Sequence, residues 1–244
     1  MPHPPGSHAS PVPGAYRGRL PFRYLVFTAG MFVMAIGIAI TARATLGTTP
    51  ISTPPYVVSL GGGITLGVAT IVMHVVFVAT QIALLRRDFE WIQLLQVLVG
   101  VGFGVFIDAA MWLTRWFEPG PYWLQWVGVL VGSAILAVGI TVQFLPKVLM
   151  NAGEGTVAAL ARVTGLRIGT MKIIFDVSLV AIGAVISLAM FGRIEGIREG
   201  TLVAMFLVGL IVGRLLPPLT RRFSGLMHQE PGDTPPEIAP DMSA

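Results

Sequence analysis

Gly63–His74, with the sequence GITLGVATIVMH, returns in altered form as Gly165–Asp176, GLRIGTMKIIFD, at an offset of 102 residues. The same offset aligns Gly37–Thr41 with Gly139–Gln143, and it aligns His74 with Asp176. Further along the chain, Gly100 and Gly104 match Gly209 and Gly213 after a slip of seven residues. An internal repeat of this kind predicts two halves that share one fold.

The composition is that of an integral membrane protein. Of the 244 residues, 54% are hydrophobic and only 11% are charged, and the mean hydropathy is +0.78. Most of the apolar runs reach the ~20 residues that are needed to cross ~30 Å of hydrocarbon. We therefore predict an all-α polytopic membrane protein with six transmembrane helices, at approximately 24–41, 64–85, 92–113, 123–145, 168–191 and 201–216.

Each half is expected to contribute three of these spans. Repeat A covers residues 21–113 and repeat B covers residues 123–219, with an extracytoplasmic linker at 114–122. Residues 1–20 and 220–244 are polar and contain many proline and glycine residues, so we predict disordered cytoplasmic tails there. Because three crossings is an odd number, the second half enters from the opposite face, and the two repeats are predicted to be inverted.

Basic residues are distributed unevenly over this predicted topology. Twelve lysine and arginine residues fall on the side of the two termini, and four fall on the other side. Since cytoplasmic loops carry the excess of basic residues, both termini are predicted to be cytoplasmic, in the plasma membrane. The same asymmetry explains the net charge of +4, so we expect the lipid bilayer as a partner and no nucleic acid.

The connection after the first span of each half does not resemble a simple loop. Residues 43–62 and 146–164 begin with helix-breaking and small polar residues, and continue into short apolar stretches at 54–60 and 156–163. Each stretch allows about two turns of helix. We predict one short re-entrant or interfacial helix in each half, with free amide groups at its N-terminal end.

Ionisable residues inside the spans are candidates for function, because charge at membrane depth is costly. His74 and Asp176 are predicted to meet near the middle of the membrane and to bind and release a proton. Two structural alternatives stay open: Lys172 can neutralise Asp176 on the same helix face, and His74 can be a packed neutral histidine. Asp108 lies near the outer end of its span and can face a substrate, water or Arg115.

Polar residues before the two short helices form a second group of candidates. Hydroxyl, amide and carboxylate groups beside irregular backbone coordinate ions and small polar solutes in transporters with broken helices. Helix capping and turn formation are the alternative roles of the hydroxyl groups. The candidates are Thr48, Thr49, Ser52, Asn151 and Glu154.

Several classes of function are excluded or lack support. The chain has no cysteine, which excludes disulfides, thiolate catalysis and cysteine metal sites. His74 is the one histidine within a predicted span, so a histidine-rich metal centre cannot be assembled there. Because we find no nucleotide-binding, hydrolase or metalloprotease motif, we expect no enzyme activity, no cofactor and no metal.

Glycines spaced four residues apart recur at matching positions of the two halves, and such spacing lets helices approach closely. Packing within the chain is their ordinary role, and a homo-oligomer held by these glycine-rich faces is a further expectation. The pairs are Gly63 and Gly67, Gly165 and Gly169, Gly100 and Gly104, and Gly209 and Gly213.

The segments LGTTPISTPPYVVSL, after the first span, and GTLVAMFLVGLIVG, in the last span, carry a family resemblance. With them the chain resembles the YczE-like branch of the YczE/YyaS/YitT group of bacterial integral membrane proteins. The resemblance extends over roughly residues 22–219. It implies a bacterial membrane protein, and it brings no catalytic or binding residues with it.

Inverted repeats with interrupted helices are common in secondary transporters. We therefore expect a transporter or exporter of a small solute, with the proton as a candidate coupling ion. The alternative is a non-transporting accessory protein that docks a partner complex through its glycine-lined faces. A water-accessible polar cavity containing His74, Asp176 or Glu154 would separate the two hypotheses.

Overall fold

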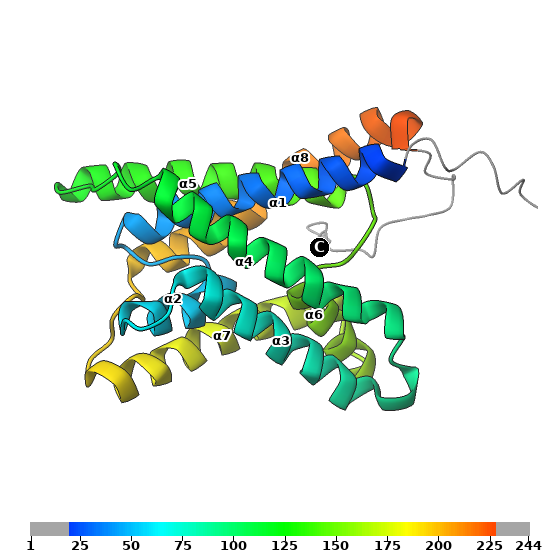
Figure 1. Cartoon of the computed structure of the whole chain (residues 1–244), viewed down its shortest axis with the longest axis horizontal. Helices are drawn as coiled ribbons and strands as arrows, with labels where there is room; N and C mark the ends of the chain where they lie inside the picture. The colour runs from blue at the N-terminus through cyan, green and yellow to red at the C-terminus, as the bar shows by residue number, and fades with distance from the viewer. Residues whose placement is uncertain (1–19, 228–244) are drawn as a thin grey trace, which may run out of the picture.

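A computed structural model describes residues 20–227, which form helices and turns without any strand (Figure 1). Short 3-10 turns lie at Pro50–Ser52 (η1), Arg86–Asp88 and Trp91–Leu94. The parts of the predicted disordered tails at 1–19 and 228–244 lie outside the described residues. The α-helices are α1 (Leu20–Arg43), α2 (Thr53–Leu60), α3 (Leu66–Leu85), α4 (Leu95–Leu113), α5 (Tyr122–Phe144), α6 (Ala152–Thr164), α7 (Ile168–Phe191) and α8 (Glu199–Met227).

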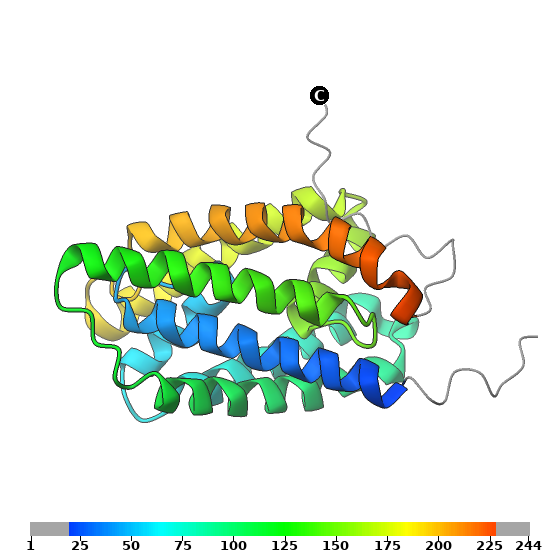
Figure 2. The same ribbon diagram turned by 90° about the horizontal axis from the view of Figure 1, so that it is seen from above.

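Six helices are long and apolar enough to cross a membrane: α1, α3, α4, α5, α7 and α8. The prediction of an all-helical chain with six helices of this kind is confirmed over residues 20–227, and their length and composition are compatible with a multi-pass membrane protein. The last helix is longer than predicted, because α8 continues through Pro217 and Pro218 to Met227. Proline removes one backbone donor and bends a helix without necessarily ending it, and Figure 2 shows α8 curving toward its end.

The long helices alternate in direction along one common axis. In Figure 1, α1 and α5 lie side by side and run in opposite directions, and α3 and α7 cross on the other side of the molecule. The diagonal helix α4 packs against both α1 and α3. The short helices α2 and α6 lie towards opposite ends of the molecule. In chain order, each half contributes three long helices and one short one.

Glycines bring the backbones of α1 and α5 into contact. A Cβ atom added to Gly37 would lie 2.7 Å from the carbonyl oxygen of Gly132, so no larger residue fits without separating the helices. The contacts are reciprocal. When both residues of one contact pair are shifted by the repeat offset of 102, the result is another contact pair of the same interface. These pairs are Gly30 with Gln143, Gly132 with Thr41, Gly37 with Leu136, and Gly139 with Met34.

Backbone conformation also matches at equivalent positions of the two halves. Thr45 and Lys147 both have positive φ, at 59° and 43°, which is uncommon for residues other than glycine. Thr49 precedes η1 with φ and ψ of −67° and 154°, and Asn151 precedes α6 with −64° and 150°. The internal sequence repeat is therefore accompanied by matching backbone turns in the two halves.

Most helix pairs in one half have a counterpart in the other. The pair α1 and α4 corresponds to α5 and α8, and the pair α2 and α3 corresponds to α6 and α7. Across the halves, α2 packs on α7 as α6 packs on α3. One correspondence fails, because α3 packs closely on α4 whereas α7 makes no comparable contact with α8.

Candidate functional site at the two short helices

The first turns of the two short helical segments meet inside the protein. A Cβ atom added to Gly153, in the first turn of α6, would clash with the side chain of Ile51 in η1. Ile51 and Gly153 are equivalent residues of the repeat. Both segments then run outward, so that α2 ends near exposed Leu60 and α6 ends near exposed Thr164. Polar residues of both halves are thereby brought to one place.

The start of α6 corrects one prediction. The helix begins at Ala152 rather than at Thr156, because Asn151 already has the extended conformation of an N-cap residue. Glu154 therefore lies in the first helical turn and not in a segment that precedes the helix. In the first half the predicted start is nearly correct, since α2 begins at Thr53.

Glu154 has an unusual environment for a carboxyl group. Its Oε2 atom is fully buried and has no hydrogen-bond partner among the described residues. Burial raises the pKa of the Glu154 carboxyl above its ordinary value, and the positive charge of Lys172 offsets part of that rise. Nearby Asp176 adds to the rise, so the neutral carboxylic acid is favoured here.

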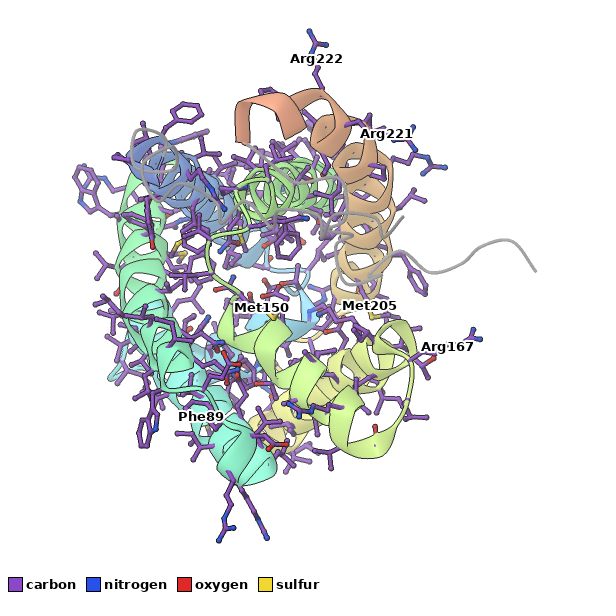
Figure 3. All side chains as sticks on the ribbon, turned by 90° about the vertical axis from the view of Figure 1, so that its right-hand side faces the viewer. Phe89, Met150, Arg167, Met205, Arg221 and Arg222 are labelled. Carbon is purple, nitrogen blue, oxygen red and sulfur yellow. The ribbon has the colours of Figure 1, made fainter. Side chains whose placement is uncertain are left out.

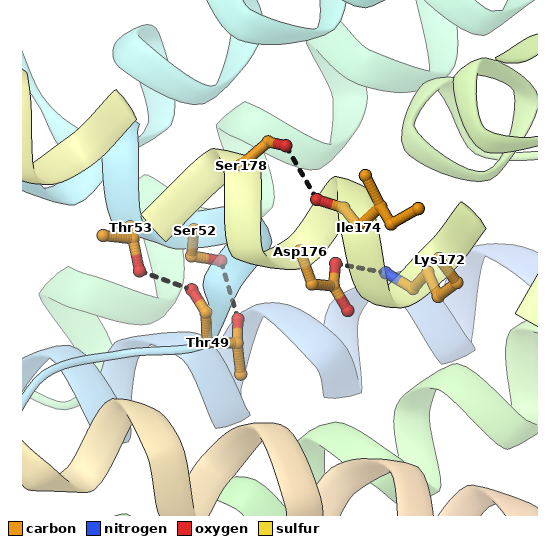
Figure 4. A network of polar contacts seen from close by, with 7 residues as sticks. All are labelled: Thr49, Ser52, Thr53, Lys172, Ile174, Asp176 and Ser178. Atoms are coloured by element: carbon orange, nitrogen blue, oxygen red, sulfur yellow. Dashed lines mark hydrogen bonds and ion pairs between the residues drawn. The ribbon is translucent and has the colours of Figure 1, made fainter. Parts of the chain in front are cut away.

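Asp176 is neutralised on its own helix. Lys172 Nζ lies 2.7 Å from Asp176 Oδ1, and the two side chains are 36% and 15% exposed. Figure 4 shows this ion pair on the side of α7 where Thr49 and Ser52 lie, with Ser178 on the other side. The contact of α7 with η1 is consistent with that view. Of the two roles open for Asp176, the structure contains the ion pair.

His74 is packed among apolar groups. It is 4% exposed, its Nδ1 lies 2.9 Å from the carbonyl oxygen of Thr70, and its ring contacts Phe77 and Phe103 edge to face. None of the hydrogen bonds or ion pairs described for residues 20–227 joins His74 to Asp176. Their predicted joint role in proton transfer stays a prediction, and the environment of His74 is that of a packed histidine.

The hydroxyl groups near the start of α2 bond to one another and to backbone carbonyl oxygens. Thr41 and Thr48 share a hydrogen bond of 3.3 Å between their Oγ1 atoms, and Thr49 Oγ1 donates to Ser52 Oγ at 3.2 Å. Thr53 Oγ1 donates to the carbonyl oxygen of Thr49. The Thr49 side chain makes no capping bond to η1, so the capping role expected as the alternative for Thr49 is absent.

Asn151 and Gln143 leave polar atoms unpaired beside the first turn of α6. Asn151 Nδ2 donates to Gln143 Oε1 at 3.3 Å. The other amide atoms, Asn151 Oδ1 and Gln143 Nε2, are buried and have no partner among the described residues. Because buried polar groups are normally hydrogen-bonded, one free acceptor and one free donor at this place indicate a site for a polar ligand.

Four polar residues of this region were missed from the sequence: Gln143, described above, and Gln81, Gln96 and Thr156. Gln81 Nε2 donates to Gln96 Oε1 at 3.0 Å, to the carbonyl oxygen of Ala152 at 3.1 Å and to Thr156 Oγ1 at 3.3 Å. These bonds tie the start of α6 to α3 and α4. The available signal was a neutral glutamine inside each of three apolar runs, at Gln81, Gln96 and Gln143, whereas within the spans only ionisable residues were considered.

Asp108 lies away from the short helices. Its carboxylate accepts hydrogen bonds from Thr65 Oγ1 at 2.6 Å and from the backbone amide of Gly67 at 2.8 Å. Arg115, the expected alternative partner, lies over the ring of Trp112 instead. Asp108 thus connects α4 to the first turn of α3.

The end of the molecule at which α6 terminates is seen in Figure 3, where Met150 lies in the middle of the ring of helices. Arg167, Arg221 and Arg222 point outward from the same end. The segment that carries Met150 therefore crosses the centre of the bundle between α5 and α6. Among the described residues, no group of three or more histidine, aspartate or glutamate side chains is arranged to hold a metal ion.

Comparison with known proteins gives one match. A model for a family of unknown function (DUF6198) matches residues 21–217, from α1 into α8. No curated protein and no solved structure matches the chain. Because the match covers most of the chain, including the repeat and the two short helices, this protein belongs to that family of unknown function.

Proposed function

We propose that the protein is a secondary transporter of a small polar solute in the bacterial plasma membrane, built from two inverted three-span repeats. We also propose that it belongs to the YczE-like branch of the YczE/YyaS/YitT group of bacterial membrane proteins. The reciprocal glycine contacts of α1 and α5, together with their opposite directions, support a two-fold axis in the membrane plane. The basic residues at the end seen in Figure 3 support a cytoplasmic location for that end and for both termini.

One observation carries the proposal: the meeting of the two short helical segments at a cluster of buried polar groups. Non-helical backbone at membrane depth is tolerated where it is enclosed by protein or lines a cavity. In transporters, the ends of interrupted helices at the interface between repeats bind the solute and its coupling ion. The unpaired atoms of Asn151, Gln143 and Glu154 are the groups that a solute and a proton would use.

Glu154 is our candidate for the proton-binding residue. Asp176 already has a cationic partner at 2.7 Å, whereas Oε2 of Glu154 has none among the described residues. A carboxyl group that is neutral when buried can lose its proton when the site opens to water. The positive charge of Lys172 acts on Glu154 and would stabilise the resulting carboxylate.

Proton movement into liposomes tests this proposal. The purified protein is reconstituted into proteoliposomes that contain a pH-sensitive dye, and amino acids, carboxylic acids, sugars and polyols are added outside one at a time. At least one solute is expected to change the internal pH with the wild type and not with Glu154→Gln. Glu118→Gln, in the exposed linker, is the matched control and is expected to behave like the wild type.

Two results separate the parts of the proposal. If Glu154→Gln transports a solute with the wild-type proton response, the proton role of Glu154 is wrong and transport stands. If the folded, monodisperse protein takes up no solute of the panel and exchanges none in counterflow, transport is wrong. Co-purification with another membrane protein in fixed stoichiometry would then favour the accessory function, which the open faces at Gly169, Gly209 and Gly213 would serve.

A further inference from the structure

The glycines of α3 and α4 make a close contact. A Cβ atom added to Gly104 would lie 2.6 Å from the carbonyl oxygen of Gly67, so the two backbones touch. One added to Gly100 would lie 2.7 Å from Cβ of His74. Beside this contact, Thr65 and Asp108 are joined by a hydrogen bond. In the first half, the glycines thus serve close packing of the second span on the third.

The equivalent glycines of α7 and α8 have open space beside them instead of a neighbouring helix. Gly169, Gly209 and Gly213 correspond to Gly67, Gly100 and Gly104, and no atom lies within 4 Å of a Cβ added to any of them. Neighbouring apolar side chains are exposed, with Phe206 at 72%. The helix α8 packs against α5 and lacks the packing on α7 that its counterpart α4 has on α3.

We infer that α8 closes onto α7 in a second conformation, in which Gly213 meets Gly169 and Gly209 lies beside Asp176. The inference rests on the repeat and on the helix contacts, and it holds whether or not the protein transports a solute. Within the first half, the pairings of α1 with α4 and of α2 with α3 have counterparts in the second half, so the missing pairing is the one that a conformational change would complete. The residues needed for close approach are already present on both helices.

Closure has a consequence for the ion pair on α7. Figure 4 shows the Asp176 carboxylate pointing towards the layer that contains α1 and α8. In the first half, the equivalent residue His74 is 4% exposed and is covered by Gly100 of α4. With α8 in the corresponding position, Gly209 would cover Asp176 in the same way. In the closed conformation the Lys172–Asp176 ion pair is therefore less exposed.

Engineered cysteine pairs test the inference, since the chain has no cysteine of its own. Thr65→Cys with Asp108→Cys is the reference pair, because these side chains touch in the described conformation. Arg167→Cys with Pro217→Cys is the test pair at the equivalent exposed positions. Arg167→Cys with Pro218→Cys is the control pair, because its second thiol lies on a different face of α8. Its yield measures the disulfide that forms by random collision of the two thiols. Each protein is oxidised in proteoliposomes with a copper catalyst, without any solute.

Both the reference pair and the test pair are expected to form a disulfide within one chain, above the yield of the Pro218 pair. Adding Gly213→Leu to the test pair is expected to lower its yield to that of the Pro218 pair. Space around Gly213 is open in the described conformation, so leucine is compatible with this fold and blocks only the closed one.

Three results would overturn the inference. The first is a test pair that yields no more disulfide than the Pro218 pair while the reference pair is oxidised. The second is a disulfide of the test pair that joins two chains, which would mean that a second copy covers α8. The third is a yield that Gly213→Leu leaves unchanged, because the thiols would then meet without close approach of the helices.

Discussion

At the scale of single residues, Glu154 makes the stability of the protein depend on pH. A raised pKa means that the fold favours the neutral carboxyl group more than the unfolded chain does. The resulting stabilisation is complete below the ordinary carboxyl pKa, and it is lost as pH rises through the raised pKa of the folded protein. We expect the melting temperature of the wild type to fall over that range.

Glu154→Gln should remove this part of the pH dependence, since glutamine does not titrate. Melting curves of the purified protein in detergent, recorded at a series of pH values, measure the effect. Glu118→Gln, in the exposed linker, is expected to keep the wild-type profile. Identical profiles for the wild type and Glu154→Gln would show that the buried carboxyl group contributes nothing to stability between these pH values.

A second prediction at this scale concerns Gly37. A Cβ at this position would lie 2.5 Å from the backbone nitrogen of Leu136, and neither backbone can move aside locally. Gly37→Ala is expected to destabilise the protein by about 1–3 kcal/mol, the usual cost of overpacking. Gly102→Ala is the matched control, because Gly102 lies in a helix with no atom within 4 Å of its added Cβ. Equal melting temperatures for the two variants would contradict the close α1–α5 contact.

The sequence made the residues of the site only partly predictable. Asp176 was a candidate because a charge inside an apolar run is energetically costly. Lys172 lies four residues before it, and the ion pair predicted as one alternative from this spacing is present. The role of Gln81 could not be derived, because its partners Gln96 and Thr156 lie on other helices and their distances depend on tertiary packing. The unpaired atoms near Glu154 likewise depend on how α6 is placed.

At the scale of elements, the start of α6 gives a prediction that separates capping from ligand binding. An N-cap residue that bonds to its helix contributes about 1 kcal/mol of stability. Asn151 makes no such bond to α6, and the one hydrogen bond described for its side chain is the 3.3 Å bond to Gln143, so Asn151→Ala is expected to lower stability by less than Thr65→Ala does while it reduces transport. Thr65→Ala is the contrasting variant, because Thr65 Oγ1 accepts a bond from the backbone amide of Val68 and caps α3. The paired measurement is melting temperature and solute uptake.

If Asn151→Ala destabilises the protein as much as Thr65→Ala does and leaves uptake unchanged, Asn151 has a structural role only.

Element boundaries followed the strength of the local signals. Proline after hydroxyl residues marked the start of α2 nearly correctly, since proline suits the first turn of a helix. The start of α6 was placed too late because Gly153 and Gly155 favour a break by propensity, while packing against Ile51 and Gln81 keeps them helical. The end of α8 was placed too early, because the apolar run ends at 216 whereas the helix continues through Pro217 and Pro218 into the polar sequence that follows.

At the scale of the whole molecule, the orientation in the membrane is testable with single cysteines. Gly120→Cys lies in the linker between the halves, and Arg87→Cys lies at the opposite end, after α3. An impermeant thiol reagent added to intact cells is expected to label Gly120→Cys alone and to label both variants after permeabilisation. Labelling of Arg87→Cys but not Gly120→Cys in intact cells would reverse the proposed orientation.

The sequence predicted the number of long helices, because apolar runs of sufficient length are a local pattern. The glycines at a constant offset are also a local pattern, and the inverted arrangement of the two halves that they suggest stays a prediction. The sequence did not predict that α7 and α8 lie apart. The glycines Gly169 and Gly213 carry the same signal as Gly67 and Gly104, so the pattern alone predicts contact in both halves. Which of two packings is occupied depends on small energy differences that no local pattern records.

The reciprocal contact of α1 and α5 also bears on how such a chain can arise. Because each residue pair recurs with its members exchanged, the interface is self-complementary in the way that a symmetric dimer interface is. Under the proposed inverted topology, a single three-span chain that inserted into the membrane in both orientations would form this interface from two identical copies. Duplication and fusion of that gene would then give the two halves of this protein, after which each half was free to diverge, one towards His74 and the other towards Asp176.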